Sequence, residues 1–504
     1  MDASPPDDWS PVPGAPAAAR SLPASDEQVN ADADGTKGFV RAFRAFLDEV
    51  VAKERTTAED HGPQIGEVVR EHLGSAATVT PLVVREEIPG HALVDLDIAL
   101  EVLAERGGGE RVVGVGGGDQ AHHQSFGDLL TRGYGFYGTG PVDHVNLPTG
   151  PDTTRRVIAF GVRLLTFRGQ PLAVLQRAAR PQYGRDSALE VACLDEDLAP
   201  AFIDEVRRLM LERSVLRGQV VSFSGSPFEP HSNGGITFVA RPDVGEADVV
   251  LPPGALERIR RHVIGIGRQR EQLVAAGQHL KRGVLLYGPP GTGKTHTVRH
   301  LVASAPGTTV VLLSGASLAY VTTAAQLARA TQPAVVVLED CDLVAEDRGM
   351  SPGERPLLFQ LLDAMDGLDG DADVTFLLTT NRADLLERAL AERPGRVDLA
   401  VEVPLPDLEA RRQLLRLYAR DLPLSDAALD DAAARSAGVT ASFTKELLRR
   451  AVLVAATDGR PVQDADLAEA LDELLSDAEQ LTRSLLGSGG PGTPDEGPSP
   501  GADH

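Results

Sequence analysis

Residues 283–295, GVLLYGPPGTGKT, are an apolar run followed by a glycine-rich loop, and the loop at 288–295 fits the pattern GxxxxGK[ST]. The run before the loop predicts a buried strand, and the sequence after it, HTVRHLVASA, predicts a helix. Glycines allow successive backbone N–H groups to point at phosphate oxygens, and the N-terminus of the following helix adds positive potential. A glycine-rich turn that matched by chance would lack this strand and helix, so the stretch predicts a nucleotide-binding loop.

The side chains of this loop indicate its ligands. Lys294 is placed to reach the β- and γ-phosphates of a nucleotide, and the Thr295 hydroxyl is placed to ligate Mg²⁺. The sequence therefore predicts ATP and Mg²⁺ as cofactors. The predicted nucleotide contacts are Gly288, Pro289, Pro290, Gly291, Thr292, Gly293, Lys294, Thr295 and Thr297.

Further apolar runs alternate with helical patterns across residues 246–403. TVVLLSG, AVVVLED, VTFLLTTN and AVEVPL are rich in valine and leucine. Continuous apolar runs of this length are typical of parallel strands that are buried on both faces. The predicted fold class is therefore α/β, with a parallel sheet flanked by helices.

Polar side chains end two of these predicted strands. Glu339 and Asp340 end AVVVLED, and Asn381 ends VTFLLTTN. Because the carboxyl ends of parallel strands meet at one edge of a sheet, we expect all three beside the phosphate loop. One carboxylate can hold Mg²⁺ and the other can orient the attacking water, while the amide can hydrogen-bond the γ-phosphate and that water. An ordinary acidic loop is the alternative for the carboxylates, and the preceding phosphate loop makes it the weaker one.

Arg393 and Arg396 flank a Pro-Gly pair after the last of these strand ends. Two arginines on such a turn are suited to reaching a phosphate bound by a neighbouring subunit, where an added cation stabilises transition-state charge. Solvated arginines, or a local ion pair with an acid such as Asp398, are the alternatives. The predicted catalytic residues are Lys294, Glu339, Asp340, Asn381, Arg393 and Arg396, with Thr295, Glu339 and Asp340 at the metal.

The stretch from about 250 to 480 resembles the AAA-type (AAA+) ATPases through GPPGTGKT, LLDAMDGL and TTNRADLLERALAERPGRVDLAVEVPLPD. The resemblance implies a P-loop α/β domain with a C-terminal helical lid, assembled as a ring that is usually hexameric, with ATP at the subunit interfaces. It implies that Asn381 is the sensor asparagine and that Arg393 and Arg396 are fingers acting on a neighbouring subunit. Residues 366–368 fall where such proteins relay nucleotide state between subunits.

Two features depart from the family pattern. The family usually ends its second motif in Asp-Glu, whereas this chain has Glu339-Asp340. The reversed order is also found in the AAA proteins of the mitochondrial complex III assembly type, which this region resembles through GVLLYGPPGTGKT and RPGRVDL. Asp340 is one methylene shorter than Glu, so the water that it positions sits differently and turnover can be slow. The lid sequence at 438–443, GVTASF, replaces the usual Ser-Gly-Ala-Asp and leaves open how the lid contacts adenine.

The segment at 314–322, SGASLAYVT, lies where many ring ATPases of this family carry a loop that grips polypeptide in a central pore. Tyr320 and Val321 occupy the aromatic and apolar positions of that loop, and Thr322 replaces the expected Gly. An aromatic side chain grips many sequences because it contacts them through area rather than through specific hydrogen bonds. The alternative is that Tyr320 packs against the following helix, and the sequence does not decide between the two.

The chain divides into five segments of different composition. The segment before 246 shows a hairpin turned at 168–170, an amphipathic helix in LAPAFIDEVRRLMLERSVLRG, and a strand pair in VVSFSG and GGITFVARP. The predicted segments are a disordered acidic, Pro-rich tail (1–35), an N-terminal α+β domain for partner recognition (36–245), the P-loop α/β domain (246–403), a helical lid with helices near 408–420, 425–436, 442–457 and 463–484 (404–485), and a disordered tail (486–504).

Composition limits the classes of partner. The chain of 504 residues has 49 Lys and Arg against 73 Asp and Glu, a formal net charge of −24. This field repels phosphate backbones and anionic lipid, so nucleic-acid and membrane-surface binding are disfavoured. No apolar run approaches the ~18–20 residues that span a bilayer, the two cysteines are far apart, and there is no HExxH zinc-protease motif. A cytoplasmic location is therefore expected.

The main hypothesis is a homo-oligomeric ring, hexameric as the resemblance implies, that hydrolyses ATP and remodels or unfolds a protein client. The first alternative is a nucleotide-dependent switch that binds ATP and hydrolyses it poorly, which the Glu339-Asp340 order favours. The second alternative is an ATPase that acts on nucleic acid, which the net charge disfavours.

Overall fold

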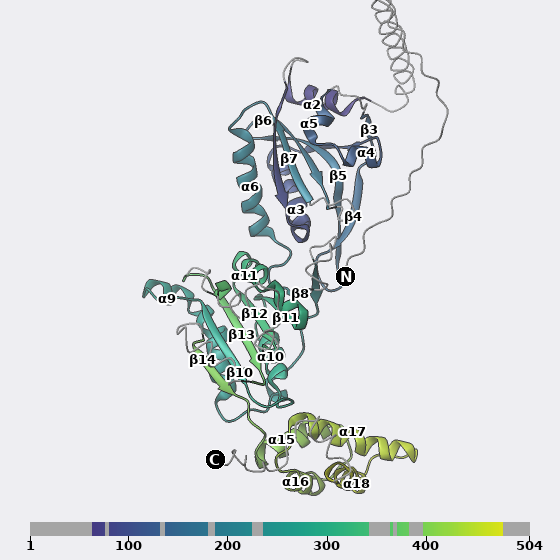
Figure 1. Cartoon of the computed structure of the whole chain (residues 1–504), viewed down its shortest axis with the longest axis vertical. Helices are drawn as coiled ribbons and strands as arrows, with labels where there is room; N and C mark the ends of the chain where they lie inside the picture. Colours follow the sequence, from purple (N-terminus) through teal and green to yellow (C-terminus); the bar gives the residue numbers. More distant parts are fainter. Residues whose placement is uncertain are drawn as a thin grey trace, which may run out of the picture.

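The computed structural model describes residues 63–75, 80–131, 137–179, 187–223, 235–341, 363–365, 370–382 and 397–476. Figure 1 shows three parts along the long axis of the molecule. We call them the N-terminal domain (63–213), the P-loop domain (220–403) and the lid (408–475), and we call residues 214–219 the joint. The predicted disordered tails, 1–35 and 486–504, lie outside the described residues.

The N-terminal domain is an antiparallel sheet with helices on both faces. The strand order is β1-β7-β6-β5-β2-β3, and β4 pairs with β5. Helices α3 and α6 cover one face, and α2 and α5 cover the other, so two apolar clusters enclose the sheet. Its elements are α2 (Ile65–Leu73), β1 (Leu82–Ile88), η2 (Gly90–Ala92), α3 (Leu93–Arg106), β2 (Glu110–Val115), α4 (Asp119–His122), α5 (Phe126–Leu130), β3 (Thr139–Gly140), β4 (Asp143–Pro148), β5 (Thr154–Phe167), β6 (Gln170–Arg177), β7 (Ser187–Cys193) and α6 (Leu198–Arg213).

The predicted hairpin and the predicted amphipathic helix are both confirmed in this domain. Strands β5 and β6 pair antiparallel, and Phe167 lies opposite Gln170 at the turn. Arg168 and Gly169 have φ values of 51° and 78°, as the left-handed two-residue turns of hairpins require. The helix α6 matches the amphipathic pattern and buries its apolar face against α3 and the sheet.

The P-loop domain is built on a second sheet, with strand order β14-β10-β13-β12-β11-β8-β9. All neighbouring strands from β14 to β8 are parallel, and only β9 is antiparallel to its neighbour. The predicted parallel sheet is therefore confirmed. Its strands are β8 (Val220–Phe223), β9 (Ile236–Val239), β10 (Arg282–Tyr287), β11 (Thr309–Ser314), β12 (Ala334–Glu339), β13 (Val374–Thr380) and β14 (Leu399–Glu402).

The boundary expected at residue 245 does not match this sheet. The strand pair predicted from VVSFSG and GGITFVARP forms, as β8 and β9, but β8 pairs parallel with β11 of the P-loop domain. The backbone of β8 provides the hydrogen-bonding neighbour of β11. The apolar side chains of Val220 and Val221 are buried between the helix layers on the two faces of the sheet. The N-terminal domain therefore ends near Arg213.

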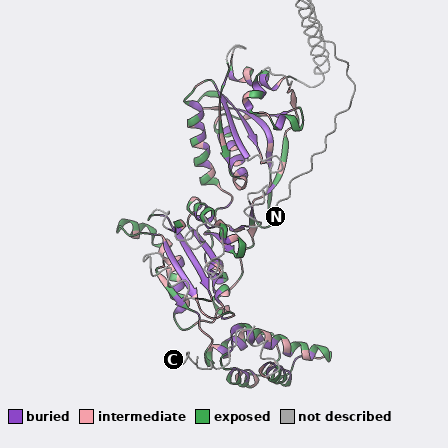
Figure 2. Cartoon of the chain, in the orientation of Figure 1, coloured by how far each residue is buried: buried purple, intermediate pink, exposed green. Residues whose placement is uncertain are grey.

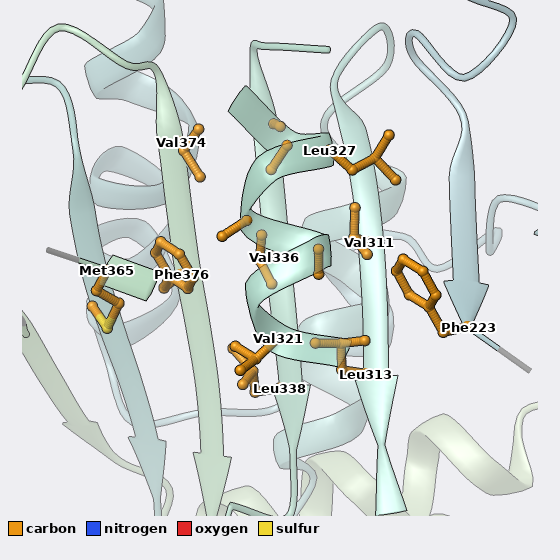
Figure 3. Packing of buried hydrophobic residues seen from close by; sticks show 14 of the residues in the cluster. Phe223, Val311, Leu313, Val321, Leu327, Val336, Leu338, Met365, Val374 and Phe376 are labelled. Carbon is orange, nitrogen blue, oxygen red and sulfur yellow. The ribbon is translucent and has the colours of Figure 1, made fainter. Parts of the chain in front are cut away.

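Helices cover both faces of the P-loop sheet. On one face, α11 packs its apolar stripe onto Val311, Val336 and Phe376, as Figure 3 shows. On the other face, α7 and α10 pack on the same strands. Figure 2 shows the strands of both sheets as the most buried elements of the chain. The remaining elements are η4 (Glu246–Asp248), α7 (Ala255–Arg260), the π-helix η5 (Arg261–Gly265), α8 (Ile266–Arg268), α9 (Arg270–Ala275), α10 (Lys294–Ala303), η6 (Gly315–Tyr320) and α11 (Val321–Ala330).

The lid is a bundle of helices around its own apolar core. The helices are α15 (Leu408–Ala419), α16 (Asp426–Arg435), α17 (Ala441–Thr457) and α18 (Asp464–Leu475), close to the predicted positions. Asp407, Ser425 and Thr440 begin the first three, and each accepts a backbone N–H with its side-chain oxygen. These caps satisfy N–H groups that have no partner within a helix and so fix where each helix starts.

Candidate nucleotide site

The phosphate loop lies at the carboxyl edge of the P-loop sheet, between the end of β10 and the start of α10. Its glycines hold conformations that other residues rarely adopt. Gly291 and Gly293 have φ values of 75° and 108°. Gly288, with φ of 144°, passes so close to β14 that an added Cβ would lie 2.2 Å from the Val403 carbonyl oxygen. The loop shape therefore depends on glycine, as the sequence pattern predicts.

Lys294 begins α10 and is buried, with only 6% of its surface exposed. Its Nζ donates to the carbonyl oxygens of Gly288 and Pro289, both at 2.8 Å, so the ammonium group lies across the loop. The ammonium group is thus held against the first two residues of the loop. Thr297, also predicted to contact nucleotide, helps to hold the loop. It is 1% exposed and its hydroxyl donates to the Gly293 carbonyl at 3.0 Å, because one helical turn separates the two residues. Its contact with nucleotide stays a prediction.

Glu339 ends β12 and Asp340 follows it, and the two carboxylates differ in hydrogen bonding and in exposure. The Glu339 carboxylate accepts a hydrogen bond from the Thr295 hydroxyl, which brings together two of the three predicted Mg²⁺ ligands. Burial, and then the charge of Asp340, raise the pKa of Glu339, while the Thr295 hydrogen bond and Arg299 lower it. Asp340 is exposed at the sheet edge.

The backbone of Asp340 is left-handed, with φ of 53°, which is uncommon for a residue other than glycine. Its N–H donates to Thr379 Oγ1 on the neighbouring strand β13 at 3.1 Å, and the Cys341 N–H donates to the Thr379 carbonyl at 2.9 Å. Strained backbone of this kind persists where neighbouring structure holds it, and it is concentrated at functional sites. Thr379 therefore fixes how the Asp340 carboxylate leaves the sheet.

The register of the sheet brings Asn381 to the same edge. Thr380, the last residue of β13, lies opposite Tyr287, the residue before the phosphate loop. Strand β12 pairs with the other side of β13. Asn381, half-buried, therefore leaves the sheet between the phosphate loop and Glu339. The structure thus gathers at one edge the loop, the carboxylates and the amide that the sequence predicts.

A pocket of about 210 Å³ beside the loop was missed by the sequence reasoning. It lies where the segment between β9 and α7 meets the segment that leads from β14 to the lid, and Thr292 of the loop lines it. Both segments are rich in proline, VLPP at 250–253 and VPLPD at 403–407, and this repetition is the signal that could have found it. The other lining residues are Val250, Leu251, Pro252, Pro253, Val403, Pro404, Leu405, Pro406, Asp407, Glu409, Ala410, Gln413, Leu414 and Ala441.

The lid touches the phosphate loop directly. The Ser442 N–H, in the first turn of α17, donates to the Gly291 carbonyl at 3.1 Å, and the Ser442 hydroxyl donates to the same oxygen at 3.3 Å. An added Cβ on Gly291 would lie 2.9 Å from the Ser442 hydroxyl oxygen. The lid sequence at 438–443, which departs from the family pattern, therefore lies at the site, and Ser442 bonds it to the loop.

These residues fit ATP with Mg²⁺. The glycine cradle and Lys294 suit the phosphates, and the apolar pocket beside Thr292 is a concave surface suited to the base. The Thr295 hydroxyl and the Glu339 carboxylate are hard oxygen ligands side by side. Mg²⁺ usually takes one or two such protein ligands and completes its shell with phosphate oxygens and waters. In keeping with this, no group of three or more His, Cys, Asp or Glu side chains within the described ranges could hold a metal ion alone.

Tyr320 and Val321, predicted for a polypeptide-gripping loop, pack inward in this conformation. Val321 begins α11 and is 1% exposed. The half-buried ring of Tyr320 stacks on Phe223 of β8, with ring centroids 4.9 Å apart and planes at 14°. The packing alternative therefore accounts for both side chains here, with Phe223 as the main partner of Tyr320. Its role in threading stays a prediction.

Three predicted features lie outside the described residues: Arg393, Arg396 and the segment 366–368. Their assignments as fingers and as a relay therefore stay predictions. The helices within the described part of the chain include none that is long and apolar enough to cross a membrane.

Comparison with known proteins places the site in a wider group. Residues 284–405 match the protein family described as "ATPase family associated with various cellular activities (AAA)". The chain is 34% identical over 264 residues to the ATP-dependent zinc metalloprotease FtsH 3 of Sphaerobacter thermophilus, an alignment that covers 50% of this chain and 53% of the relative. It is 27% identical over 420 residues to protein CdcH of Halobacterium salinarum, covering 79% of this chain and 53% of the relative. The chain thus spans about half the length of these relatives.

Proposed function

We propose that this chain, which belongs to the AAA+ family of P-loop ATPases, hydrolyses ATP to ADP and phosphate and uses the cycle to remodel or unfold a protein client. The observation that carries the proposal is the meeting of the phosphate loop, Glu339, Asp340 and Asn381 at one sheet edge. Family members use ATP with Mg²⁺, and the donor groups here fit both.

Each residue has a distinct task in the proposed reaction. The loop N–H groups and Lys294 bind the β- and γ-phosphates, and Thr295 with Glu339 would hold Mg²⁺, which neutralises charge on the phosphates when bound. Asp340 orients a water for in-line attack on the γ-phosphorus and takes its proton. As the new P–O bond forms, the bond to the β-phosphate oxygen breaks and ADP leaves. Asn381 donates to the γ-phosphate and accepts from the water.

The oligomeric part of the proposal rests on family membership and on the sequence. Rings, usually hexameric, place the arginines of one subunit at the ATP of the next, and Arg393 and Arg396 are the residues that we assign to this task. The N-terminal domain is the proposed client-binding part, because it lies at the end of the molecule opposite the lid (Figure 1). A cytoplasmic location and a protein client are part of the same proposal.

The second candidate function is a slow nucleotide-dependent switch. Two observations favour it: the Glu339-Asp340 order, and the left-handed backbone that fixes the shorter Asp340 side chain. A switch binds ATP tightly and acts through conformation rather than turnover. A nucleic-acid ATPase is disfavoured by the net charge of −24, and binding of single- and double-stranded nucleic acid at low salt tests it.

The experiment that tests the proposed ring compares ATP affinity and turnover between Arg396→Ala and the unaltered chain. We expect the variant to bind ATP normally but to lose turnover, because the finger acts on the ATP of a neighbouring subunit and not on its own. ATP affinity is measured by titration calorimetry, and turnover by phosphate release. Full turnover in Arg396→Ala would show that this residue is not a finger.

A further inference from the structure

The segment 240–253, which we call the linker, runs from the end of β9 to the pocket beside Thr292. It lies along α10, the helix whose N-terminus carries the phosphate loop. Several side chains of α10 and of the linker join the two segments by hydrogen bonds. The linker therefore touches the nucleotide site at one end and the neighbourhood of the joint at the other.

Arg241 makes the largest set of these contacts. Its Nη1 donates to the carbonyl oxygens of Val302 at 2.6 Å and Ala305 at 3.1 Å, where α10 ends. Its Nη2 donates to the carbonyl oxygens of Gly218 and Thr308, both at 2.9 Å. One guanidinium group thus binds the C-terminal end of α10, the turn that leads into β11, and the joint that follows the N-terminal domain.

The charge of Arg241 suits this position. Among the described residues, no carboxylate forms an ion pair with it, and burial lowers the pKa of its guanidinium. Arginine nevertheless stays protonated in proteins, so a positive charge stands among four carbonyl oxygens at the end of α10. The C-terminal end of a helix carries partial negative charge, which a cation there stabilises. The contact fixes the end of α10 opposite the phosphate loop.

Two histidines of α10 continue the connection toward the loop. His300 Nδ1 donates to the Val244 carbonyl oxygen, and His296 Nε2 donates to the Asp248 carbonyl oxygen, both at 2.9 Å. His296 directly follows Thr295, the predicted Mg²⁺ ligand. The Asp248 carboxylate also lies 3.4 Å from Arg420 of the lid. The linker is thus bonded to α10 over its length and contacts the lid.

The joint is fixed on its other side to the N-terminal domain. The Val215 N–H donates to the buried carboxylate of Asp95 in α3 at 2.8 Å. Arg217 donates to the carbonyl oxygens of Leu211 in α6, at 2.7 Å, and of Ala330 and Gln332 in the P-loop domain, at 3.0 Å. The joint therefore cannot move without disturbing bonds to both domains.

We propose that Arg241 is a positioning residue that makes the placement of α10, and with it the phosphate loop, depend on the N-terminal domain. Arg241 does not touch the nucleotide; it acts through the helix. Coupling between two sites is reciprocal, so nucleotide binding must in turn change the joint. The inference rests on the proposed nucleotide binding, but it is independent of hydrolysis and of ring formation.

The first test uses the unaltered full chain and hydrogen–deuterium exchange, with and without AMP-PNP and Mg²⁺. We expect AMP-PNP to slow exchange at 288–300, where it binds, and also at the joint, by at least ~fivefold. Slower exchange at 288–300 alone would overturn the inference and leave the proposed nucleotide site intact. No change at either place would overturn the proposed function together with the inference.

The second test compares Arg241→Gln with Arg70→Gln, a control that also loses a bond from a guanidinium to a backbone carbonyl, that of Leu130 at 2.7 Å, but lies within the N-terminal domain and bonds neither the joint nor α10. We expect Arg241→Gln to bind AMP-PNP more weakly and to lose the response of the joint, while Arg70→Gln keeps the affinity of the unaltered chain. A joint that still responds in Arg241→Gln, or an equal loss of affinity in Arg70→Gln, would overturn the inference. If Arg241→Gln does not fold, Arg241→Lys takes its place, because lysine keeps the charge but cannot bridge four carbonyls.

Discussion

The two sheets of this protein have the same layers, but within the described ranges only the parallel one presents carboxylates at an edge where a ligand is expected. Both are enclosed by helices on two faces, but the N-terminal sheet is antiparallel and the P-loop sheet is almost entirely parallel. The parallel sheet keeps Glu339 and Asp340 at its carboxyl edge, where a ligand can reach them. The antiparallel sheet buries its charges: Arg163, 2% exposed, pairs with Asp97 and Glu110, each at 2.5 Å. The parallel sheet also buries a pair, Arg282 with Asp373 at 2.7 Å, where its strands begin. Among the described residues, the charges placed to act on a ligand thus lie at the carboxyl edge of the parallel sheet, and the buried pairs of both sheets hold the fold.

The largest effect, on the free energy of unfolding, is expected from removing one charge of the buried network in the N-terminal sheet. Arg163→Met leaves the Asp97 carboxylate buried without its main partner, which costs ~3–5 kcal/mol of unfolding free energy. Urea denaturation measures this loss. Arg156→Met is the matched control, because Arg156 is an exposed arginine on the same strand, and it should change stability by less than ~0.5 kcal/mol. Equal stability of the two variants would show that the buried network contributes little.

The second largest effect, on ATP affinity, is expected at the carboxyl edge of the parallel sheet. Lys294→Ala removes the ammonium group that lies across the phosphate loop, so ATP affinity should fall at least ~100-fold, or ~2.7 kcal/mol. Titration with a fluorescent ATP analogue measures it. Lys445→Ala, at an exposed position on α17, is the control and should bind like the unaltered chain. Retained affinity in Lys294→Ala would place the phosphates elsewhere.

A smaller effect is expected from the residue that fixes Asp340. Thr379→Val removes the hydroxyl that accepts the Asp340 N–H, so the carboxylate should lose its alignment while ATP binding is kept. We expect kcat to fall about tenfold with little change in KM. Thr375→Val, which removes a buried hydroxyl on the same strand that bonds Val263, is the control. The assignment fails if the two variants have the same kcat.

The smallest effect is a pH dependence at Asp95. Burial raises the pKa of Asp95 from 3.8 to about 6, against the hydrogen bonds from Ser214 and Val215 and the charge of Arg217. The folded state therefore holds this proton more tightly than the unfolded chain, so ionisation costs stability as the pH rises from about 4 to 6. Asp95→Asn keeps an oxygen for the Val215 N–H and removes the charge. It should be more stable than the unaltered chain by ~1–2 kcal/mol above pH 7.

Near pH 4 the advantage of Asp95→Asn should disappear, because Asp95 is then protonated in the folded state. Thermal unfolding of both chains between pH 4 and pH 8 measures the difference. A constant difference across this range would show that Asp95 does not titrate as described.

The contrast between the sheets also explains what the sequence could predict. Parallel strands appear as continuous apolar runs, and the loop at 288–295 fixes which edge is functional, so Lys294, Thr295, Glu339, Asp340 and Asn381 could be placed at one edge. By contrast, Arg163 is a single charge within an apolar strand, and nothing local shows that Asp97 and Glu110, distant in sequence, surround it.

The wrong domain assignment of β8 and β9 and the unpredicted pocket beside Thr292 have the same physical cause: both depend on contacts between segments distant in sequence. The pair β8 and β9 was assigned to the N-terminal domain because local sequence predicts a strand pair but not the neighbour that it joins. The pocket beside Thr292 forms from two segments about 150 residues apart, so only the fold could reveal its shape.

The most direct test of the central claim is the rate of ATP hydrolysis per subunit as a function of protein concentration, with Mg²⁺, for the unaltered chain and for Asp340→Asn. If the edge of the parallel sheet is a catalytic site shared between subunits, the rate per subunit rises with concentration and then levels off. In Asp340→Asn the rate falls at least ~100-fold while ATP binding is retained. A rate that is negligible at all concentrations despite tight ATP binding, or one that survives in Asp340→Asn, would contradict this account.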